Sequence, residues 1–463
     1  MKILHITLGI PKYRAGGLIN YTYSVAKTES KIGHDVTIMY PGHYDMLQRH
    51  TRINKIEQEE HFKVYELINP SFVAVPLGIK NPDLFLQSVD SRIYAEFLQM
   101  VNPDLIHIHT FMGFHKELFE ELKRFPAPVV FTTHDYYPVC PKTSRINEKN
   151  EICNNENAFN CAKCNAQARN SILVQYVLQS RWYPQLKRTA FLTNLKKKRK
   201  VLMKESADEE IVVSSEVEET IGMGTVNKYE KLIEQFNKNL SCVDIFHCNS
   251  SVTEMIYRDM FTEKKHFILN ITSNGIKDMR NETKVLPYHD KGIINIGFIG
   301  IRNYHKGYWI LRDAGEILYS KGYRFQISFY GDEFNIDTRK YSFCMDMGMF
   351  PHNELSNVMK TLDVMVVPSY CFETFGFSTL EAVANGVPVL VSNHAGSKDI
   401  LQNISMPHEF TPEPCELSEL LEKYLSSPEL LDQLQKEQQR LTPIFSMKEH
   451  VKQLLEEIDG LVH

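Results

Sequence analysis

Two successive sets of short, nearly continuous apolar runs are the feature of this sequence that most constrains its fold. The runs occupy residues 3–8, 36–40, 105–108, 129–132, 267–271, 293–299, 325–330, 364–367 and 389–391. Runs of this length are typical of strands that are buried on both faces of a parallel sheet. Helical patterns at residues 18–32 and 378–385 lie between strands, so the alternation predicts right-handed βαβ units.

The alternation occurs twice, which predicts two α/β domains. The first set of runs ends near residue 271, and the polar stretch 284–292 is predicted to be a linker before the second set. We therefore expect a first domain over residues 1–285, a second over 286–440, and a C-terminal helix in 441–463 that packs back on the first domain. Residues 140–240 lack the strand pattern and are predicted to be an insertion in the first domain. A chain of 463 residues fits this division, because single cores rarely grow so large.

Charge and hydropathy exclude several classes of protein. The net charge of −5 and the pI near 6.4 argue against a globally basic nucleic-acid binder. The apolar run at the N-terminus is broken by His5 and stopped by Pro11, so it is too short for a signal peptide. No stretch approaches the roughly 20 apolar residues of a spanning helix. We expect a soluble cytoplasmic protein without a nucleic-acid partner.

The second domain offers a phosphate and sugar site where the strand at 364–367 ends. A loop runs from Ser369 through Phe375 to Gly376, and a helix follows. Ligands of open α/β sheets bind at the carboxyl ends of strands, and a helix N-terminus attracts phosphate. Glu373 on the loop can contact a sugar, and Glu381, one turn into the helix, can accept hydrogen bonds from a ribose diol. Two acids at this spacing can also be ordinary surface residues.

Two glycine-flanked loops could contact the same ligand. Arg302 and Lys306 follow the first strand of the second domain and could clamp a diphosphate, although a solvated loop with two ordinary cations is equally consistent with them. Gly16 and Gly17 follow the first strand of the chain. They could let the backbone approach a ligand, or they could only form a tight turn.

Polar residues at two strand ends of the first domain form a candidate acceptor site. His134 and Asp135 follow the strand at 129–132, and His109 follows the strand at 105–108. A histidine at a strand end can hydrogen-bond a hydroxyl group near neutral pH. A structural role is equally open for His109.

These motifs, in this order, resemble glycosyltransferase family 4, whose GT-B fold consists of two facing Rossmann-like, doubly wound domains with a cleft between them. The resemblance is carried by the two acids with seven residues between them, by the loop that ends in Gly307, by the early glycine pair, and by residues 102–109 and 131–135. It implies a retaining enzyme that uses a nucleoside-diphosphate sugar, with uridine or guanosine as the nucleoside. It also implies a glycan or lipid-linked acceptor in the synthesis of capsule, exopolysaccharide or another envelope polysaccharide.

The resemblance also implies roles for single residues. Arg302 and Lys306 would hold the diphosphate, Glu381 the ribose and Glu373 the donor sugar, and the base would lie near Phe350. His134 would lie at the reacting centre, Asp135 and His109 would line the acceptor side, and Gly16 and Gly17 would lie against the donor phosphates. No catalytic cofactor is implied. A GT-B-fold epimerase or phosphorylase, and a non-catalytic partner subunit of another glycosyltransferase, remain alternatives.

The insertion carries two further features. Cys140, Cys153, Cys161 and Cys164 could close a tetrahedral zinc site or remain thiols, while disulfides are disfavoured in a reducing compartment. Residues 182–204 combine aromatic side chains with a dense run of cations. Such a segment suits peripheral contact with an anionic membrane at its inner face, although a solvated helix face is the alternative.

Overall fold

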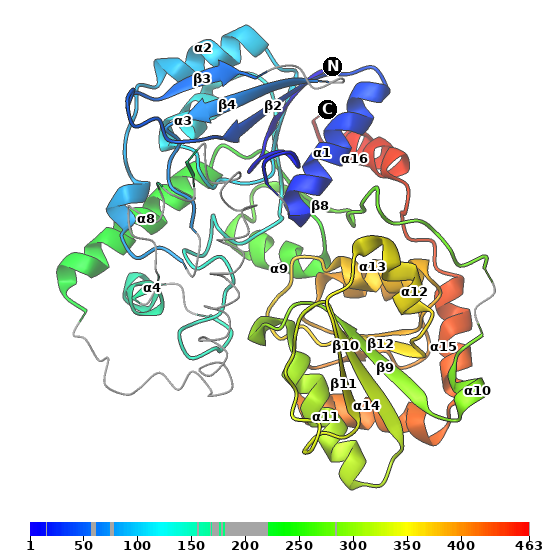
Figure 1. Cartoon of the computed structure of the whole chain (residues 1–463). Coiled ribbons are helices and arrows are strands. Elements are labelled where there is room, and N and C mark those ends of the chain that lie inside the picture. The colour runs from blue at the N-terminus through cyan, green and yellow to red at the C-terminus, as the bar shows by residue number, and fades with distance from the viewer. Residues whose placement is uncertain are drawn as a thin grey trace. The chain divides into compact units, whose positions relative to one another are not determined.

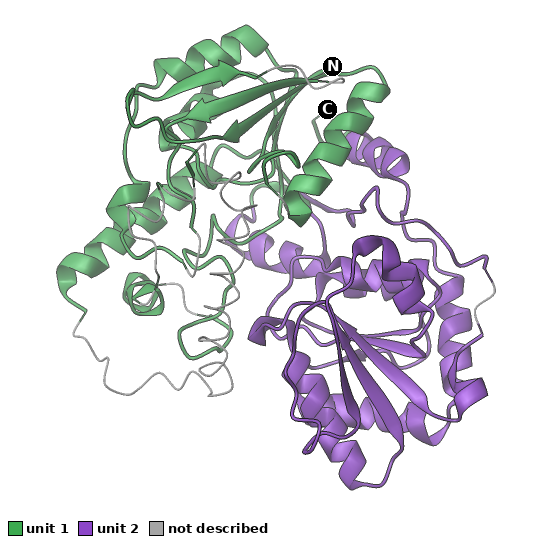
Figure 2. Ribbon diagram, viewed as in Figure 1, with its two compact units in different colours: residues 1–247, 263–265, 458–463 green, residues 248–262, 266–457 purple. Residues whose placement is uncertain are grey.

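The computed structural model describes residues 1–14, 16–56, 62–74, 78–154, 157–166, 168, 176, 179–180, 221–282 and 285–462. The chain forms two compact units (Figure 2). Unit 1 contains residues 1–247, 263–265 and 458–463, and unit 2 contains residues 248–262 and 266–457. Each unit is built on its own sheet, and the pairing of strands within each sheet is almost entirely parallel.

The first sheet has the strand order β3-β4-β2-β1-β5-β6-β7-β8. Figure 1 labels β2, β3, β4 and β8 of this sheet. Its strands are β1 (Lys2–Ile6), β2 (Asp35–Pro41), β3 (Arg52–Lys55), β4 (Lys63–Ile68), β5 (Leu105–Ile108), β6 (Val129–Thr132), β7 (Ile245–Cys248) and β8 (Lys265–Ile268). The helices of unit 1 include α1 (Gly17–Lys31), α2 (Arg92–Val101), α3 (Lys116–Arg124), α4 (Ala158–Asn165) and α8 (Met223–Leu240). The chain adds strands on one side of β1 and then continues with β5 on the other. The β1/β5 pair is therefore a topological switch point, where ligands of such sheets bind.

The second sheet repeats this plan with the order β11-β10-β9-β12-β13-β14. Its strands are β9 (Ile294–Ile299), β10 (Phe325–Tyr330), β11 (Cys344–Gly348), β12 (Val364–Val367), β13 (Val389–Ser392) and β14 (Glu409–Phe410). Its helices include α9 (Ser251–Met260), α10 (Tyr288–Lys291), α11 (Tyr308–Ser320), α12 (Leu355–Met359), α13 (Phe377–Ala384), α14 (Pro414–Ser426), α15 (Glu429–Gln439) and α16 (Met447–Val462), with 3-10 turns η2 (Tyr304–Lys306), η3 (His352–Glu354) and η4 (Gly396–Leu401). The switch point lies between β9 and β12.

The apolar runs predict most of the central strands, but β4 and the fully buried β7 were missed. The predicted strands at 105–108, 129–132, 325–330 and 364–367 are confirmed as β5, β6, β10 and β12, and the predicted helix at 18–32 is confirmed as α1. All residues of β5, β6 and β12 are buried, as expected for strands covered on both faces. The edge strands β3 and β11 were missed because much of their surface is exposed, so their sequences contain no continuous apolar run.

The division between the units lies earlier than the predicted boundary at residue 285. The proposed linker at 284–292 is part of unit 2, because Leu286 and Tyr288 are buried in its core. The backbone N–H of Tyr288 also donates to Asp363 Oδ1 at 2.8 Å. Residues 248–262 join the same unit, where the hydroxyl of Ser251 donates to Asp399 Oδ1 at 2.6 Å. Polar composition suggested a linker, but it did not reveal these buried anchors.

The C-terminal segment divides between the units. Residues 441–457 belong to unit 2, and only residues 458–463 belong to unit 1. In unit 1, Lys265 Nζ contacts the carbonyl oxygen of Leu461. The prediction was that residues 441–463 pack on the first domain. Most of this segment, residues 441–457, belongs to unit 2 instead.

Within the insertion, α4 and the long helix α8 are present, and the basic segment 182–204 lies outside the described residues. Among the helices that the structure describes, none is both long enough and apolar enough to span a bilayer.

Candidate functional site

The loop between β12 and α13 carries the acid that the sequence assigned to the donor sugar. The strand emerges from the core, and the loop begins at Ser369. Two backbone hydrogen bonds then fix Glu373: its N–H donates to the carbonyl of His394, and its carbonyl accepts from the N–H of Gly396, each at 2.9 Å. Gly376 has a φ of +93°, which favours glycine, and α13 begins at the next residue. The first turn of α13 contains no acidic residue, so its N–H groups are suited to an anion.

The loop after β9 is held directly beside the loop after β12. Gly307 has a φ of +70°, and a Cβ atom at this position would lie 1.8 Å from the carbonyl oxygen of Pro368. The N–H of Tyr370 donates to the carbonyl of His305 at 3.0 Å. The two loops therefore meet at the switch point of the second sheet, and the close approach requires glycine.

Lys306 and Glu373 form an ion pair where these loops meet. Lys306 Nζ contacts Glu373 Oε1, and the hydroxyl of Ser369 donates to Glu373 Oε2. Burial raises the pKa of Glu373, but the lysine charge and the two hydrogen bonds outweigh burial and hold the pKa below its ordinary value. Burial lowers the pKa of Lys306, but Glu373 outweighs that effect and raises it. Both side chains are therefore charged near neutral pH.

Glu381 projects from α13, in the turn after the helix start at Gly376. Burial raises its pKa, and the nearby His352 reduces the shift only in part. Contacts within the protein offset only part of the cost of burying the Glu381 charge. This carboxylate is therefore suited to accept hydrogen bonds from ligand hydroxyls.

The second predicted cation has different contacts from Lys306. The Arg302 guanidinium carbon lies 6.0 Å from the centre of the Tyr308 ring. The backbone N–H of Arg302 donates to Asp332 Oδ2 at 3.2 Å, which fixes the start of the loop after β9. The structure thus brings Lys306 and Glu373 into contact and places Arg302 earlier on the same loop.

Two aromatic residues complete the predicted donor set. Phe350 follows β11 and packs edge-on against Tyr330, the last residue of β10, with ring centres 5.9 Å apart. Phe375 is only 2% exposed, and its ring packs against Phe377 at 5.4 Å. The ring of Phe375 therefore supports the loop from inside, and only its backbone is available to a ligand.

In unit 1, the loop after β1 contains a cation that the sequence analysis did not identify. Arg14 Nη1 donates to the carbonyl of Leu8 at 3.1 Å, and burial lowers the pKa of Arg14. A Cβ atom on Gly9 would lie 3.0 Å from Arg14 Cδ, so the glycine makes room for this side chain. Gly16 then caps α1, which starts at Gly17. A positive charge beside a helix start and a glycine pair is a recognisable anion-binding pattern.

The predicted acceptor residues lie together at the ends of β5 and β6. His109 is fully buried, and its Nδ1 lies 3.3 Å from His134 Nε2. Asp135 Oδ1 accepts from the N–H of Tyr137 at 3.0 Å, and Asp135 Oδ2 accepts from the hydroxyl of Thr110 at 3.4 Å. Burial raises the pKa of Asp135 to about 6, despite these two hydrogen bonds.

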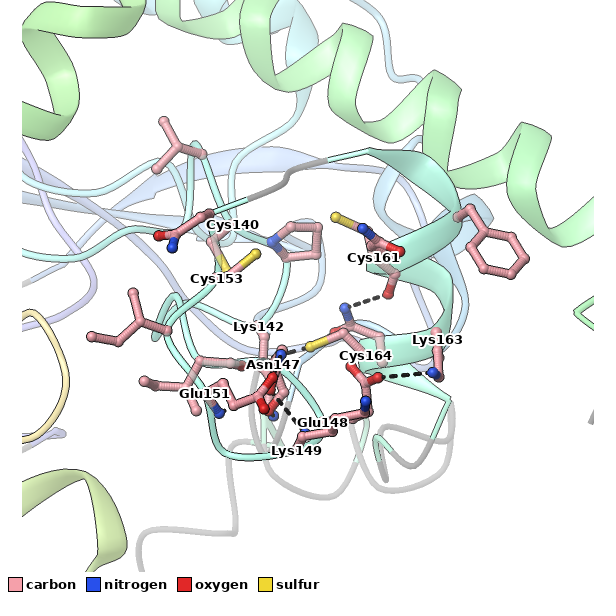
Figure 3. Close-up of a pocket in the computed structure, with 18 residues that line it drawn as sticks. Cys140, Lys142, Asn147, Glu148, Lys149, Glu151, Cys153, Cys161, Lys163 and Cys164 are labelled. Carbon is pink, nitrogen blue, oxygen red and sulfur yellow. Dashed lines mark hydrogen bonds and ion pairs between the residues drawn. The ribbon is translucent and has the colours of Figure 1, made fainter. Parts of the chain in front are cut away.

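The four cysteines of the insertion line one cavity of unit 1, together with α4 (Figure 3). Cys140 and Cys161 are buried, whereas Cys153 and Cys164 are partly exposed. Cys164 Sγ donates to the carbonyl of Ile146 at 3.6 Å. Burial raises the pKa of Cys164 to about 12.

The cysteine sulfurs do not form a compact ligand set. Among the described residues, the single group of three potential ligand atoms within 4.8 Å of one another belongs to His5, His107 and His109. Tetrahedral zinc binds sulfur at about 2.3 Å, so its ligands lie closer together than these sulfurs do. Zinc binding in the cavity would therefore draw the sulfurs inward.

Comparisons with known proteins match this chain to two families of glycosyltransferases. The family described as Glycosyltransferase Family 4 matches residues 15–220, and the family described as Glycosyl transferases group 1 matches residues 345–441. The first match covers the glycine pair and the strand-end histidines, and the second covers Glu373 and Glu381. A search of curated protein sequences finds no significant match.

Several solved structures are similar over nearly the whole chain. A sucrose-phosphate synthase from Thermosynechococcus elongatus is 14% identical, with a TM-score of 0.54 and 99% of both chains covered. A glycosyltransferase from Rickettsia africae is 13% identical, with a TM-score of 0.55, 99% of this chain and 98% of that chain covered. HepE from Anabaena, solved in complex with UDP, is 13% identical, with a TM-score of 0.51, 99% of this chain and 100% of that chain covered. At this identity, the similarity establishes the fold alone.

The two family matches cover different units, and the two parallel sheets have the strand order and switch points of Rossmann-like domains. This chain is a GT-B glycosyltransferase of the family 4 type.

Proposed function

We propose that this glycosyltransferase transfers a sugar from a nucleoside-diphosphate sugar with retention of configuration. The observation that carries the proposal is the contact between Lys306 and Glu373 at the β9/β12 switch point, directly before the N-terminus of α13. A cation and free backbone N–H groups attract a diphosphate, and a carboxylate beside them can hold sugar hydroxyls. This combination suits a ligand that joins a diphosphate to a sugar.

The residues of unit 2 have distinct roles in this proposal. Lys306 and Arg302 balance the charge of the diphosphate, which increases as the sugar leaves. Glu381 binds the ribose hydroxyls, Glu373 binds hydroxyls of the donor sugar, and Phe350 borders the base. Uridine or guanosine diphosphate is the proposed leaving group, and the similarity to HepE, which was solved with UDP, supports uridine.

The residues at the strand ends of unit 1 are proposed to act on the acceptor side. His134 contacts the reacting hydroxyls, and His109 and Asp135 support it. Gly16 and Gly17, with Arg14 beside them, approach the donor phosphates. The proposed acceptor is a glycan or a lipid-linked sugar in the synthesis of capsule, exopolysaccharide or another envelope polysaccharide.

Release of nucleoside diphosphate from a panel of UDP- and GDP-sugars tests the donor assignment. The wild type should hydrolyse at least one donor slowly, and Glu381→Ala should reduce this rate. Glu422→Ala is a matched control, because Glu422 pairs with Lys321 at 2.7 Å on another surface of unit 2. The anomeric configuration of the transferred sugar tests retention. Absence of both turnover and binding with every donor would instead favour a non-catalytic partner subunit, and isomerised donor as product would favour an epimerase.

A cytoplasmic location with peripheral membrane contact is also part of the proposal. The basic and aromatic segment 182–204 would bind an anionic surface, which suits a lipid-linked acceptor. Sedimentation with vesicles should show binding that requires acidic lipid and weakens with salt. Equal binding to neutral vesicles, or no binding to either, would refute this contact.

Structural zinc in the insertion is a separate proposal. Its support is that all four cysteines line one cavity (Figure 3). Coordination would deprotonate the thiols and draw the segments of the insertion together. Metal analysis of the folded protein should find about one zinc per chain, and the Cys161→Ser/Cys164→Ser variant should lose it. A well-folded, metal-free wild type would refute the proposal.

A further inference from the structure

Three histidines meet in the core of unit 1. His5, His107 and His109 are fully buried, although the polar nitrogens of each ring need partners inside a core. One nitrogen from each of the three rings lies within 4.8 Å of the other two. Among the described residues, these three form the one group of potential metal ligands at such short distances. The proposed function uses His109 only as a support for His134, so the group as a whole has no role in it.

The parallel pairing of β1 with β5 builds the group. His5 and His107 are partners in register on these two strands. The N–H of His109 donates to the carbonyl of Ile6 at 2.8 Å, which extends the pairing one residue beyond β5. Side chains two residues apart on a strand share one face of the sheet, and the ring centres of His107 and His109 are 4.1 Å apart. Two central strands of the sheet therefore hold all three rings.

Two of the ring nitrogens already have nearly the separation that a shared metal ion requires. His5 Nδ1 and His109 Nε2 lie 3.0 Å apart in a hydrogen bond, which a bound ion would replace. Zinc binds imidazole nitrogen at about 2.0–2.1 Å, so neighbouring ligand atoms in a tetrahedral site lie roughly 3.3 Å apart. The His107 nitrogen would have to move from at most 4.8 Å to roughly this distance. The cysteine sulfurs of the insertion form no comparably compact set.

Glu29 of α1 contacts the opposite side of the His5 ring. Its Oε2 lies 2.6 Å from His5 Nε2, and no described atom hydrogen-bonds to its Oε1. A histidine that binds a metal through one nitrogen usually donates the hydrogen of its other nitrogen to a carboxylate, which fixes the ring and strengthens the ligand. Glu29 is fully buried and would also supply negative charge close to the ion, which a set of neutral rings lacks.

The other two rings have outer partners as well. The hydroxyl of Thr132 lies 2.6 Å from His107 Nε2, and His134 Nε2 lies 3.3 Å from His109 Nδ1. Each ring is thus oriented by a group on its outer side, while His5 Nδ1 and His109 Nε2 face each other on the inner side. Outer partners on every ligand are typical of metal-binding histidines.

We propose that His5, His107 and His109 form a buried structural site for a late divalent transition ion, with Glu29 as the carboxylate that orients His5. Imidazole suits Ni²⁺, Cu²⁺ and Zn²⁺, and the affinity of a nitrogen site rises along the series to Cu²⁺ and falls again at Zn²⁺. Because all three ligands are fully buried, the ion would join β1 to β5 and would not meet a substrate. The inference does not rest on the proposed sugar transfer.

Cobalt is the probe, because Co²⁺ enters nitrogen sites and its absorption spectrum reports its ligands. The Cys161→Ser/Cys164→Ser variant is produced in medium with added Co²⁺, so that two of the four thiols of the cysteine cavity are absent. After gel filtration we expect about one cobalt per chain, with visible bands of a nitrogen-bound ion and no thiolate-to-cobalt charge-transfer band. A well-folded variant without bound metal, or cobalt with thiolate bands, would overturn the proposal. This measurement needs no change to the histidines.

His107→Asn in the same background removes one ligand, and His247→Asn is the matched control. Both histidines are fully buried, and both contact the hydroxyl of Thr132, at 2.6 and 2.8 Å, but His247 lies outside the group of three. We expect His107→Asn to weaken cobalt binding by more than the ten- to hundredfold, approximately, that the loss of an outer partner costs, and His247→Asn to retain binding. Zinc that is retained in the parent variant and lost in His107→Asn would support the proposal equally. Equal metal binding by the two histidine variants would overturn it.

Glu29→Gln tests the orienting carboxylate, with Glu117→Gln as its control. Glu117 is a buried carboxylate on α3 of the same unit and lies outside the histidine group. Cobalt binding should weaken about ten- to a hundredfold in Glu29→Gln and stay unchanged in Glu117→Gln. Bound cobalt should raise the Tm of the parent variant but not of His107→Asn, because an ion that binds only folded protein stabilises it. Equal Tm shifts in these two proteins would contradict the site, and unchanged binding in Glu29→Gln would refute the role of Glu29.

Discussion

Gly307→Ala separates the two loops that form the candidate donor site. The residue adopts a φ of +70°, and a new Cβ would lie 1.8 Å from the carbonyl oxygen of Pro368. The obstacle is backbone, so a side chain cannot rotate away to relieve the contact. The loop after β9 must move from the end of β12, and this displaces Lys306, the preceding residue, from Glu373.

Two contributions set the expected loss of stability. A left-handed conformation costs a non-glycine residue about 1–2 kcal/mol. Overpacking costs about 1–3 kcal/mol more, for a total of about 2–5 kcal/mol. For a domain of this size, each kcal/mol lowers the Tm by about 2–4 °C, so the unfolding transition of unit 2 should fall by about 4–20 °C. A displacement on the order of 1 Å at the site can reduce donor turnover about a hundredfold.

Gly292→Ala is the matched control, because Gly292 has a φ of +64° but nothing within 4 Å of the position of a new Cβ. It should show only the conformational cost of about 1–2 kcal/mol and should retain donor turnover. Urea unfolding and donor hydrolysis are measured for both variants. If Gly307→Ala and Gly292→Ala lost the same stability and the same turnover, the inferred contact between the two loops would be refuted.

Three further outcomes follow from the buried ionisable groups and the cysteines. Burial raises the pKa of Glu381, so the folded protein binds this proton more tightly than the unfolded chain does, and the free energy of unfolding falls as the pH rises through the ordinary carboxyl range. In chemical denaturation at pH 7, Glu381→Gln should therefore be more stable than wild type, yet it should bind the donor more weakly. The pKa of Asp135 rises from 3.8 to about 6, so wild type should lose stability over that interval, and Asp135→Asn should flatten this part of a stability–pH curve; an unchanged slope would contradict the assigned burial. Chelation should lower the Tm of wild type but not of the Cys161→Ser/Cys164→Ser variant; equal shifts would count against zinc in this cavity.

The sequence was most informative where a residue is constrained by its immediate neighbours. The central strands β5, β6, β10 and β12 are continuous apolar runs because both of their faces are covered. The sequence placed Lys306 and Glu373 on two loops of one candidate site, but their ion pair is a finding of the structure. Local pattern was sufficient for these strands, and the loops after β9 and β12 lie at the same sheet edge because the two strands are paired.

Features that depend on long-range register could not be predicted in this way. His5 and His107 interrupt apolar strands and look like isolated polar residues in the sequence, yet the pairing of β1 with β5 brings them together. The linker prediction at 284–292 was wrong for a related reason, because the role of Tyr288 depends on Asp363, which is distant in sequence. The contact of Arg302 with Tyr308 likewise depends on a loop conformation that residue spacing alone does not determine.

Nucleotide-dependent stabilisation tests the central claim most directly. Thermal unfolding is followed with UDP, GDP and their sugars for wild type, Lys306→Met and Lys321→Met, the last a control in which a lysine of unit 2 loses only its pair with Glu422. Saturation at about a hundred times the Kd should stabilise wild type and the control by about 2.7 kcal/mol, and Lys306→Met should lose most of this gain. A site that stabilises no nucleotide, or one that Lys306→Met leaves intact, would contradict the account.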